Sequence, residues 1–384
     1  MAFTGKATYS AGVTLPEIAE DVSDLVGIIS PYETPLLDAI GDPLREAKST
    51  YHEWLEDSLV PNKDTIDDSS ISDPDGETSF DVANGDRFRA GDQIQVADSE
   101  ELMLVTDVSD DTITVVRGYA GTTPENIADG QVINILGNAA LEGGDKPATR
   151  FTNRVRCGNY TQIFTVSVEV SGTNIAASHL GISDEMDYQK QERLRGLIRD
   201  LENTIISGGQ PAANPQGSAS VRRSMRGIIP HISTHVYRPG DSGFPSGDDL
   251  DESKINYVLR QIWENSSGNI DLIVVGGYQK RRINAFLSAS RSFGPTDRAY
   301  TDMVSIYESD FGVCRIITSR WVPQDTVLLL DSSRISVLPL AGRSFHFKPL
   351  ASSGDYECGQ LIGEYTLEFR NEAAHGLIRD LAMS

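Results

Sequence analysis

The stretch SDEMDYQKQERLRGLIRDLENTIISGG, residues 183–209, sets the architecture of this chain because it predicts one long helix. Ser183 or Asp184 can cap its first turn, and Gly208-Gly209 follows Ile206 as a stop signal. At 1.5 Å per residue, about 23 helical residues span roughly 35 Å, the width of a domain. One face is apolar and the other is densely charged. We therefore expect a spine helix over about 184–206 that packs on a sheet through Leu194, Leu197, Ile198, Leu201 and Ile205.

Two segments far apart in the sequence carry the period of half-buried strands. Upstream of the helix, RFTNRVRCGNYTQIFTVSVEVSG (150–172) alternates apolar and polar residues. Near the C-terminus, GQLIGEYTLEFRNEAAHGLIRDL (359–381) alternates in the same way and then changes to a pattern that predicts a short terminal helix. We expect the C-terminal segment to rejoin the sheet of the spine helix.

Between these segments the pattern becomes α/β from Leu250 onward. A helix is predicted through Ile255, Leu259 and Ile262, and a second helix over 279–287. Buried strands are predicted from the strings LIVVGG (272–277), CRIITSRW (314–321), VLLLD (327–331) and ISVLPL (335–340). This order of elements predicts a second compact domain.

An acidic lobe precedes the strand segment predicted within residues 150–172. Residues 64–145 contain nineteen carboxylates and three basic residues, so they hold sixteen of the 23 net negative charges. Short β patterns start at Asp92, Glu101, Thr112 and Gln131, with turn residues between them, and predict a small β barrel or sandwich. The flanking segments, 50–62 and 140–151, are too short to be domains. They indicate the outgoing and returning legs of a stalk.

The N-terminal region predicts two helices. Leu15, Ile18, Val22, Leu25, Val26 and Ile29 fall on one helical face after a flexible arm. Thr34 can then cap a helix of two turns that has Pro35 in its first position and ends at Gly41.

Length and composition narrow the class of protein. A chain of 384 residues favours two or three domains, and its three cysteines, Cys157, Cys314 and Cys358, fit separate thiols in a reducing compartment. The sequence shows neither a signal-peptide pattern nor an apolar run of about 20 residues. A net charge of −23 disfavours sequence-specific nucleic-acid binding and membrane docking. We expect a protein of the cytoplasm.

The motifs that could carry chemistry are weak. GDSG (240–243) resembles a serine-protease turn but lies in a flexible polar setting, which predicts a mobile surface loop. His231 and His235 are four residues apart, but GIIPHISTHVY favours a strand, which would hold them roughly 13 Å apart. The acidic run near Gly76 lacks the first and last ligands of a calcium loop and predicts a linker. We therefore expect no enzyme, no catalytic residues, no cofactor and no bound metal.

The order of elements resembles the major capsid proteins of tailed bacteriophages of the Hong Kong 97 type, in their SU-ten-like subgroup. Four strings support the resemblance: TPLLDAIG (34–41), STYHEWLEDSL (49–59), VVRGYAGTT (115–123) and ALEGGDKP (140–147). The resemblance implies an α+β fold with the following parts: an N-terminal arm (1–33), an E-loop (41–151) with an inserted all-β domain (about 72–139), a peripheral domain with the spine helix (152–226 and 346–384) and an axial domain (227–345).

For function, the resemblance implies a subunit that self-assembles into hexamers and pentamers of an icosahedral head around double-stranded DNA. Scaffold, portal and decoration proteins would be its other partners, and it would contact the packaged DNA non-specifically. Assembly would take place in the host bacterial cytoplasm. Tyr51, Trp54 and Leu55 are large apolar residues on a stalk too thin to bury them, so we expect them to pack on an adjacent subunit.

Two alternatives share parts of this pattern. An encapsulin-like bacterial compartment has the same fold but encloses cargo enzymes, and the long acidic insertion argues against it. A soluble sugar-binding protein or enzyme could use the β lobe, but between Thr65 and Ala139 the aromatic residues are only Phe80, Phe88 and Tyr119.

Overall fold

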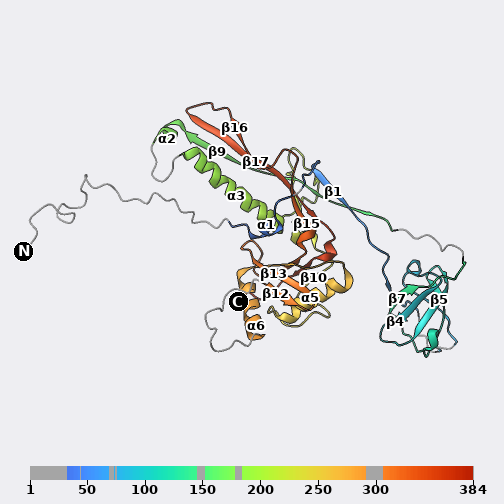
Figure 1. Ribbon diagram of the computed structural model, residues 1–384. Coiled ribbons are helices and arrows are strands. Elements are labelled where there is room, and N and C mark those ends of the chain that lie inside the picture. The colour runs from blue at the N-terminus through green and yellow to red at the C-terminus, as the bar shows by residue number, and fades with distance from the viewer. Residues whose placement is uncertain are drawn as a thin grey trace, which may run out of the picture. The chain divides into compact units, whose positions relative to one another are not determined.

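The computed structural model describes residues 33–43, 45–68, 73, 76–144, 152–177, 184–290 and 306–383 (Figure 1). The N-terminal arm and the helix expected over 15–29 lie outside these residues. The chain forms two compact units. One comprises Met1–Trp54 with Arg156–Ser384, and the other is Leu55–Val155, which contains the acidic lobe.

The long helix of the first unit is α3, Glu185–Ser207, as its sequence predicts. The carboxylate of Asp184 caps it by accepting a hydrogen bond from the backbone N–H of Asp187 at 3.1 Å. At the other end the N–H of Gly208 donates to the carbonyl of Thr204, and a Cβ on Gly208 would lie 2.4 Å from that carbonyl oxygen. Glycine is therefore required where the helix stops.

Helix α3 packs on a four-stranded antiparallel sheet whose central strand is β17, Tyr356–Phe369 (Figure 1). Strand β17 pairs with β9 (Gln162–Ser171), β15 (Ile335–Pro339) and β16 (His346–Leu350). Two expectations need correction here. The string ISVLPL forms β15 in this sheet rather than in the α/β sheet. The predicted terminal helix is a 3-10 turn, η4 (Glu372–Ala374), followed by a strand.

That last strand, β18 (Gly376–Ile378), joins the second sheet of the unit instead. Six strands lie there in the order β10, β18, β14, β11, β13, β12. The others are β10 (Val236–Tyr237), β11 (Leu272–Val275), β12 (Ile306–Ser309), β13 (Gly312–Thr318) and β14 (Val327–Leu330). Helices α5 (Glu252–Asn265) and α6 (Gly277–Ser290) complete this α/β region, as predicted.

Strand β11 links the two halves of the first unit because both its faces are buried. Leu272 and Val274 belong to the apolar cluster that contains the α3 face. Ile273 and Val275 belong to the cluster beneath α5. A fully apolar strand with a period of two therefore joins two cores, and the first unit is compact as a whole.

The acidic unit contains a six-stranded antiparallel sheet in the order β2, β7, β4, β5, β6, β3. The strands are β2 (Lys63–Thr65), β3 (Ser79–Asp81), β4 (Asp92–Val96), β5 (Leu102–Ser109), β6 (Thr112–Val116) and β7 (Val132–Asn138). The outer strands meet: Ile66 bridges Val82, and the N–H of Ala83 donates to the carbonyl of Thr65 at 2.9 Å. The sheet therefore closes into a small barrel.

The shorter elements connect these parts. They are α1 (Pro35–Ile40), β1 (Tyr51–Glu56), β8 (Val155–Tyr160), α2 (Gly172–Ala176), α4 (Ile228–His231) and the 3-10 turns η1 (Gly85–Arg87), η2 (Tyr119–Gly121) and η3 (Ser332–Arg334). Strands β1 and β8 pair as a two-stranded ribbon where the chain leaves and re-enters the first unit.

Candidate functional site

Strand β17 has an apolar face and a polar face, and both are buried. Tyr365, Leu367 and Phe369 pack in the core beneath α3. The alternate residues Glu364, Thr366 and Glu368 point to the opposite face, yet the exposed fraction of each is 3% or less. A buried carboxylate needs partners to offset its loss of hydration. Both glutamates have them.

Glu364 has three partners from different segments: two hydrogen-bond donors and one further guanidinium in an ion pair. Arg223 Nη2 lies 2.5 Å from Oε1, and Arg343 Nε lies 2.8 Å from Oε2. The buried hydroxyl of Thr161 donates to Oε1 at 2.6 Å. This carboxylate therefore fastens the start of β9 and the loop before α4 to the central strand.

Glu368, four residues further along β17, fastens the segment that leads into β1. Arg45 Nη2 lies 2.8 Å from Oε1, and His52 Nε2 lies 2.8 Å from Oε2. Burial by itself would raise the pKa of Glu368, but the hydrogen bond from His52 and the charge of Arg45 hold that pKa below its usual range. Glu368 is therefore an anion at neutral pH, with cationic groups around it.

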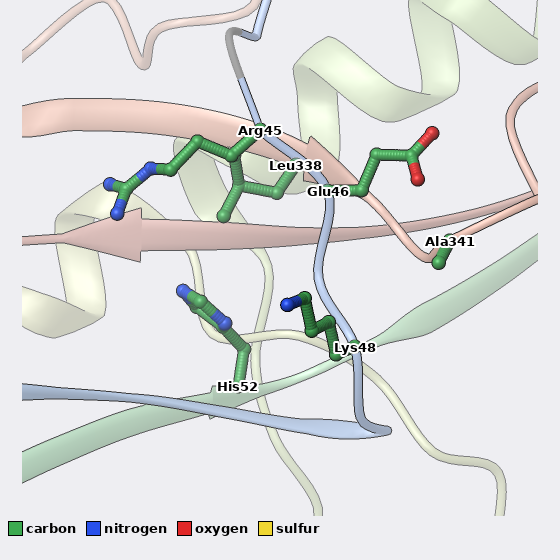
Figure 2. A pocket seen from close by; sticks show the side chains of 6 residues that line it. All are labelled: Arg45, Glu46, Lys48, His52, Leu338 and Ala341. Carbon is green, nitrogen blue, oxygen red and sulfur yellow. The ribbon is translucent and has the colours of Figure 1, made fainter.

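The backbone between Arg45 and His52 is fixed by the sheet. The N–H of Ala47 donates to the carbonyl of Pro339, and the N–H of Ala341 donates to the carbonyl of Ala47, each at 2.8 Å. A pocket of about 590 Å³ lies beside this segment and is lined by Arg45, Glu46, Lys48, His52, Leu338 and Ala341. Figure 2 shows the nitrogen-bearing ends of Arg45, Lys48 and His52 directed to one side, while the carboxylate of Glu46 points away.

The stalk residues Tyr51, Trp54 and Leu55 do not share one environment. Trp54 is only 9% exposed, whereas Tyr51 is 37% and Leu55 61% exposed. The ring of Tyr51 lies 4.5 Å from that of Tyr160 and covers Gly158, where a Cβ would lie 2.7 Å from the Tyr51 ring. The premise of a stalk too thin to bury apolar groups is wrong for Trp54, because β8 pairs with β1 and widens the segment. Leu55 has the exposed apolar surface.

The apolar face of α3 meets the core. Leu197, Leu201 and Ile205 are buried, and Leu194 packs against the same cluster with part of its surface exposed. Ile198 lies beside a second pocket of about 590 Å³ between α1, α3 and β15. The same helix also places one carboxyl group in the core.

That group is Glu202, whose side chain is fully buried. Its Oε2 accepts from the N–H of Leu37 at 3.3 Å, and its Oε1 accepts from the Ser319 hydroxyl at 3.1 Å. Thr34 makes no side-chain cap to α1, so Glu202 takes that role from a distant helix. Burial raises the pKa of Glu202 to about 7, although hydrogen bonds from Leu37, Leu36 and Ser319 oppose the rise.

The motifs considered for chemistry have structural roles. After GDSG, Phe244 is buried and stacks on Tyr237 with ring centres 5.5 Å apart, so this surface loop is packed down rather than loose. His231 ends α4, a helical turn and not the predicted strand, and His235 precedes β10. Within the described ranges, no three His, Cys, Asp or Glu side chains group as metal ligands, and no helix is long and apolar enough to cross a membrane. The three cysteines form no disulfide.

The polar layer on β17 was missed by the sequence reasoning. The signal is present in EYTLEFR (364–370), where charged or hydroxyl residues alternate with large apolar ones. Such alternation normally means a solvated face. Nothing local shows that Arg45, Arg223 and Arg343 cover it.

Comparison with known proteins finds the same fold over nearly the whole chain. Residues 3–382 match the family model described as SU10 major capsid protein. The major capsid protein of Escherichia phage Phieco32 is 22% identical over 340 residues, which cover 77% of this chain and 94% of that protein. Among solved structures, the capsid of Myoviridae phage XM1 has a TM-score of 0.53 at 9% identity and covers 96% of this chain and 99% of its own. The cyanophage A-1(L) capsid has a TM-score of 0.50 at 12% identity, with 96% and 98% covered.

The two solved structures support the fold, and the family match supports more than the fold because it extends over nearly the whole chain. The resemblance inferred from the sequence is therefore confirmed. This chain belongs to the SU10 major capsid protein family.

Proposed function

We propose that this chain is the shell-forming subunit of a tailed-phage head, which assembles into hexamers and pentamers of an icosahedral shell around double-stranded DNA. The family match over residues 3–382 carries this proposal. Closed shells require one chain to make similar contacts in slightly different settings. A rigid first unit with a separate barrel unit suits that requirement.

The proposed domains follow the family layout with strand-level adjustments. The arm comprises 1–33, and the E-loop comprises 41–151. Its inserted barrel begins at Lys63, not near 72, because β2 pairs with β7, and it ends at Asn138. The peripheral domain comprises 152–226 and 346–384 with α3 as spine helix, and the axial domain comprises 227–345. We assign β15 to the peripheral sheet and β18 to the axial sheet because of their pairing.

The other partners are part of the proposal. As a head subunit, the chain would have scaffold, portal and decoration proteins as partners. It would assemble in the bacterial cytoplasm and have a structural rather than an enzymatic role. Contact with DNA would be non-specific. The net charge of −23 predicts weak affinity of the isolated subunit for DNA, with little dependence on salt.

Expression of the chain alone, followed by size exclusion and negative-stain electron microscopy, tests the shell-forming role. Closed polyhedral particles or rings of five and six subunits are the expected result. A monomer that stays monomeric at high concentration and with crowding agents would overturn the proposal. Particles that carry enzyme cargo when expressed in the host would indicate a compartment shell in place of a phage head.

We expect Leu55→Ser to raise the subunit concentration at which shells form by about tenfold or more, because one leucine buried at an interface contributes about 1.5 to 3 kcal/mol. Leu55 is mostly exposed in the single chain, so the stability of the subunit should not change. Light scattering at a series of concentrations measures the assembly threshold.

Trp54→Ala provides the contrast. Because Trp54 is buried in its own chain, its loss should lower the free energy of unfolding of the subunit by about 3 to 5 kcal/mol.

For Leu55→Ser, shells with an unchanged assembly threshold and unchanged stability would refute a role of Leu55 between subunits.

A further inference from the structure

Around the pocket beside Arg45, Lys48 and His52, the cations Arg45, Lys48 and Arg370 outnumber the carboxylates Glu46 and Glu368 by one. Glu368 is the buried anion of this site, and it is shared by Arg45, His52 and Arg370, the last at 3.4 Å. Lys48 is exposed and forms no ion pair or hydrogen bond with any residue in the described ranges. Its amino group points to the same side as the ring of His52 (Figure 2). The pocket is therefore suited to an added oxyanion.

The chain itself carries many carboxylates that could supply this oxyanion. Three of the four basic residues of the barrel (Lys63–Asn138) are paired within it: Arg87 with Asp64, Arg89 with Asp92, and Arg117 with the buried Glu101. Among the other described carboxylates of the barrel, Asp107 and Asp110 form no ion pair with a described residue. In a shell, copies of one chain lie beside one another at high effective concentration.

The β5–β6 hairpin has the narrowest acidic tip of the barrel. Ser109 pairs with Thr112, so the loop is two residues long, Asp110-Asp111. Asp107, Asp110 and Asp111 are all exposed. The Asp111 carboxylate accepts a hydrogen bond from the N–H of Gly85, whereas the side chains of Asp107 and Asp110 form no hydrogen bond or ion pair with a described residue. This turn is shorter than the loop between β4 and β5, which runs from Ala97 to Glu101, and is therefore the narrower of the two acidic tips.

We propose that the pocket lined by Arg45, Lys48 and His52 binds the β5–β6 tip of a second copy's barrel, with Lys48 pairing to a carboxylate of Asp107 or Asp110. The inference rests on the proposed shell-forming function. It specifies an electrostatic contact between copies, so salt should weaken this contact in the shell.

Zero-length carbodiimide coupling tests the contact, because it joins an amine to a carboxylate only where the two are in ion-pair contact. Wild-type shells, purified and treated, should yield a peptide joining Lys48 to residues 107–111. Subunits dissociated before treatment should not yield it. Asp107→Asn with Asp110→Asn should abolish the coupling of Lys48 to positions 107 and 110, because carbodiimide activates a carboxylate and not an amide.

Matched variants keep the test independent of folding. Asp98 and Asp110 both have positive φ, 65° and 53°, and asparagine tolerates that conformation. Asp98→Asn with Glu100→Gln at the other tip should leave the coupling unchanged. Lys48→Glu should raise the assembly threshold about tenfold at low salt and less at high salt, whereas Lys348→Glu, an exposed lysine on β16, should not.

Coupling of Lys48 to 107–111 in shells alone supports the proposal. Equal coupling in dissociated subunits would mean a contact within one chain and would overturn it. If Lys48 couples to no carboxylate, and DNA protects it from acetylation in filled particles but not in empty ones, the pocket binds phosphate and the proposal fails. Absence of shells in electron micrographs is a separate result, which refutes the proposed function first.

Discussion

Replacing Glu364 with alanine will lower the free energy of unfolding of the subunit by about 3 to 5 kcal/mol, the usual cost of removing one member of a buried ion pair. The side chain of Glu364 is 3% exposed, and that of Arg223 beside it is 20% exposed. Without the carboxylate, Arg223 and Arg343 lose their shared anion, and Thr161, itself buried, loses its acceptor. Unfolding in urea, followed by tryptophan fluorescence at pH 7.5, measures the loss.

Glu357→Ala is the matched control, because Glu357 lies on the same strand, is exposed and forms no side-chain hydrogen bond or ion pair with a described residue. It should change the free energy of unfolding by no more than about 0.5 kcal/mol. A loss of less than about 1 kcal/mol for Glu364→Ala would mean that Arg223 and Arg343 find water or other acceptors. The layer would then not hold the strands together.

The elements with a long and regular pattern were predictable from the sequence. Helix α3 has an acidic cap, an apolar face and a glycine stop, and each of these is local. The barrel strands follow from short β-rich runs between turn residues. Both the pattern and the residues that end it lie within a few positions of one another in the sequence, so they can be recognised without knowledge of tertiary contacts.

The pairing partners were not predictable, because they are set by contacts between distant segments. The string ISVLPL has the composition of a buried strand in either sheet, and only the register Ile335 with Phe369 places it beside β17. Gly376–Ile378 follows a polar turn and looked helical, but the buried β14 offers it an open edge. Trp54 depended in the same way on β8, a strand about 100 residues later.

The second large effect is the change in the free energy of unfolding when the pH falls. His375 is fully buried, and its Nδ1 accepts from the N–H of Asp331 at 3.2 Å, while its Nε2 faces the carbonyl of Arg370 at 3.4 Å. The ring therefore has to be neutral, since protonated Nδ1 could not accept. It stacks on Phe369 at 4.2 Å, and His231 lies against the same ring at 5.4 Å.

Burial lowers the pKa of both histidines from 6.5 to about 4. Asp331 and Glu372 face His375 and oppose this change, whereas Arg334 adds to it. Between pH 6.5 and 4 the unfolded chain binds these protons and the folded chain does not. The stability contributed by the neutral rings is therefore complete above pH 6.5 and is lost as the pH falls through 4.

Glu202 acts in the opposite direction over an overlapping range. Its pKa is about 7 in the folded chain and 4.5 as a free side chain. The folded subunit therefore binds this proton first, and its stability rises as the pH falls from 7 to 4.5. From pH 7.5 to 5, the two histidines should lower the free energy of unfolding by about 4 kcal/mol and Glu202 should raise it by about 2.5 kcal/mol.

We therefore expect wild-type subunits to lose only about 1.5 kcal/mol between pH 7.5 and 5, whereas Glu202→Gln subunits should lose about 4 kcal/mol. Adding His375→Gln to Glu202→Gln should halve that loss, because one titrating ring is removed. Urea unfolding of unassembled subunits at the two pH values measures all three. Equal losses in wild type and Glu202→Gln would mean that Glu202 is ionised throughout. The cap that α3 provides to α1 would then be insensitive to pH, and the acid response would belong to the histidines that enclose Phe369.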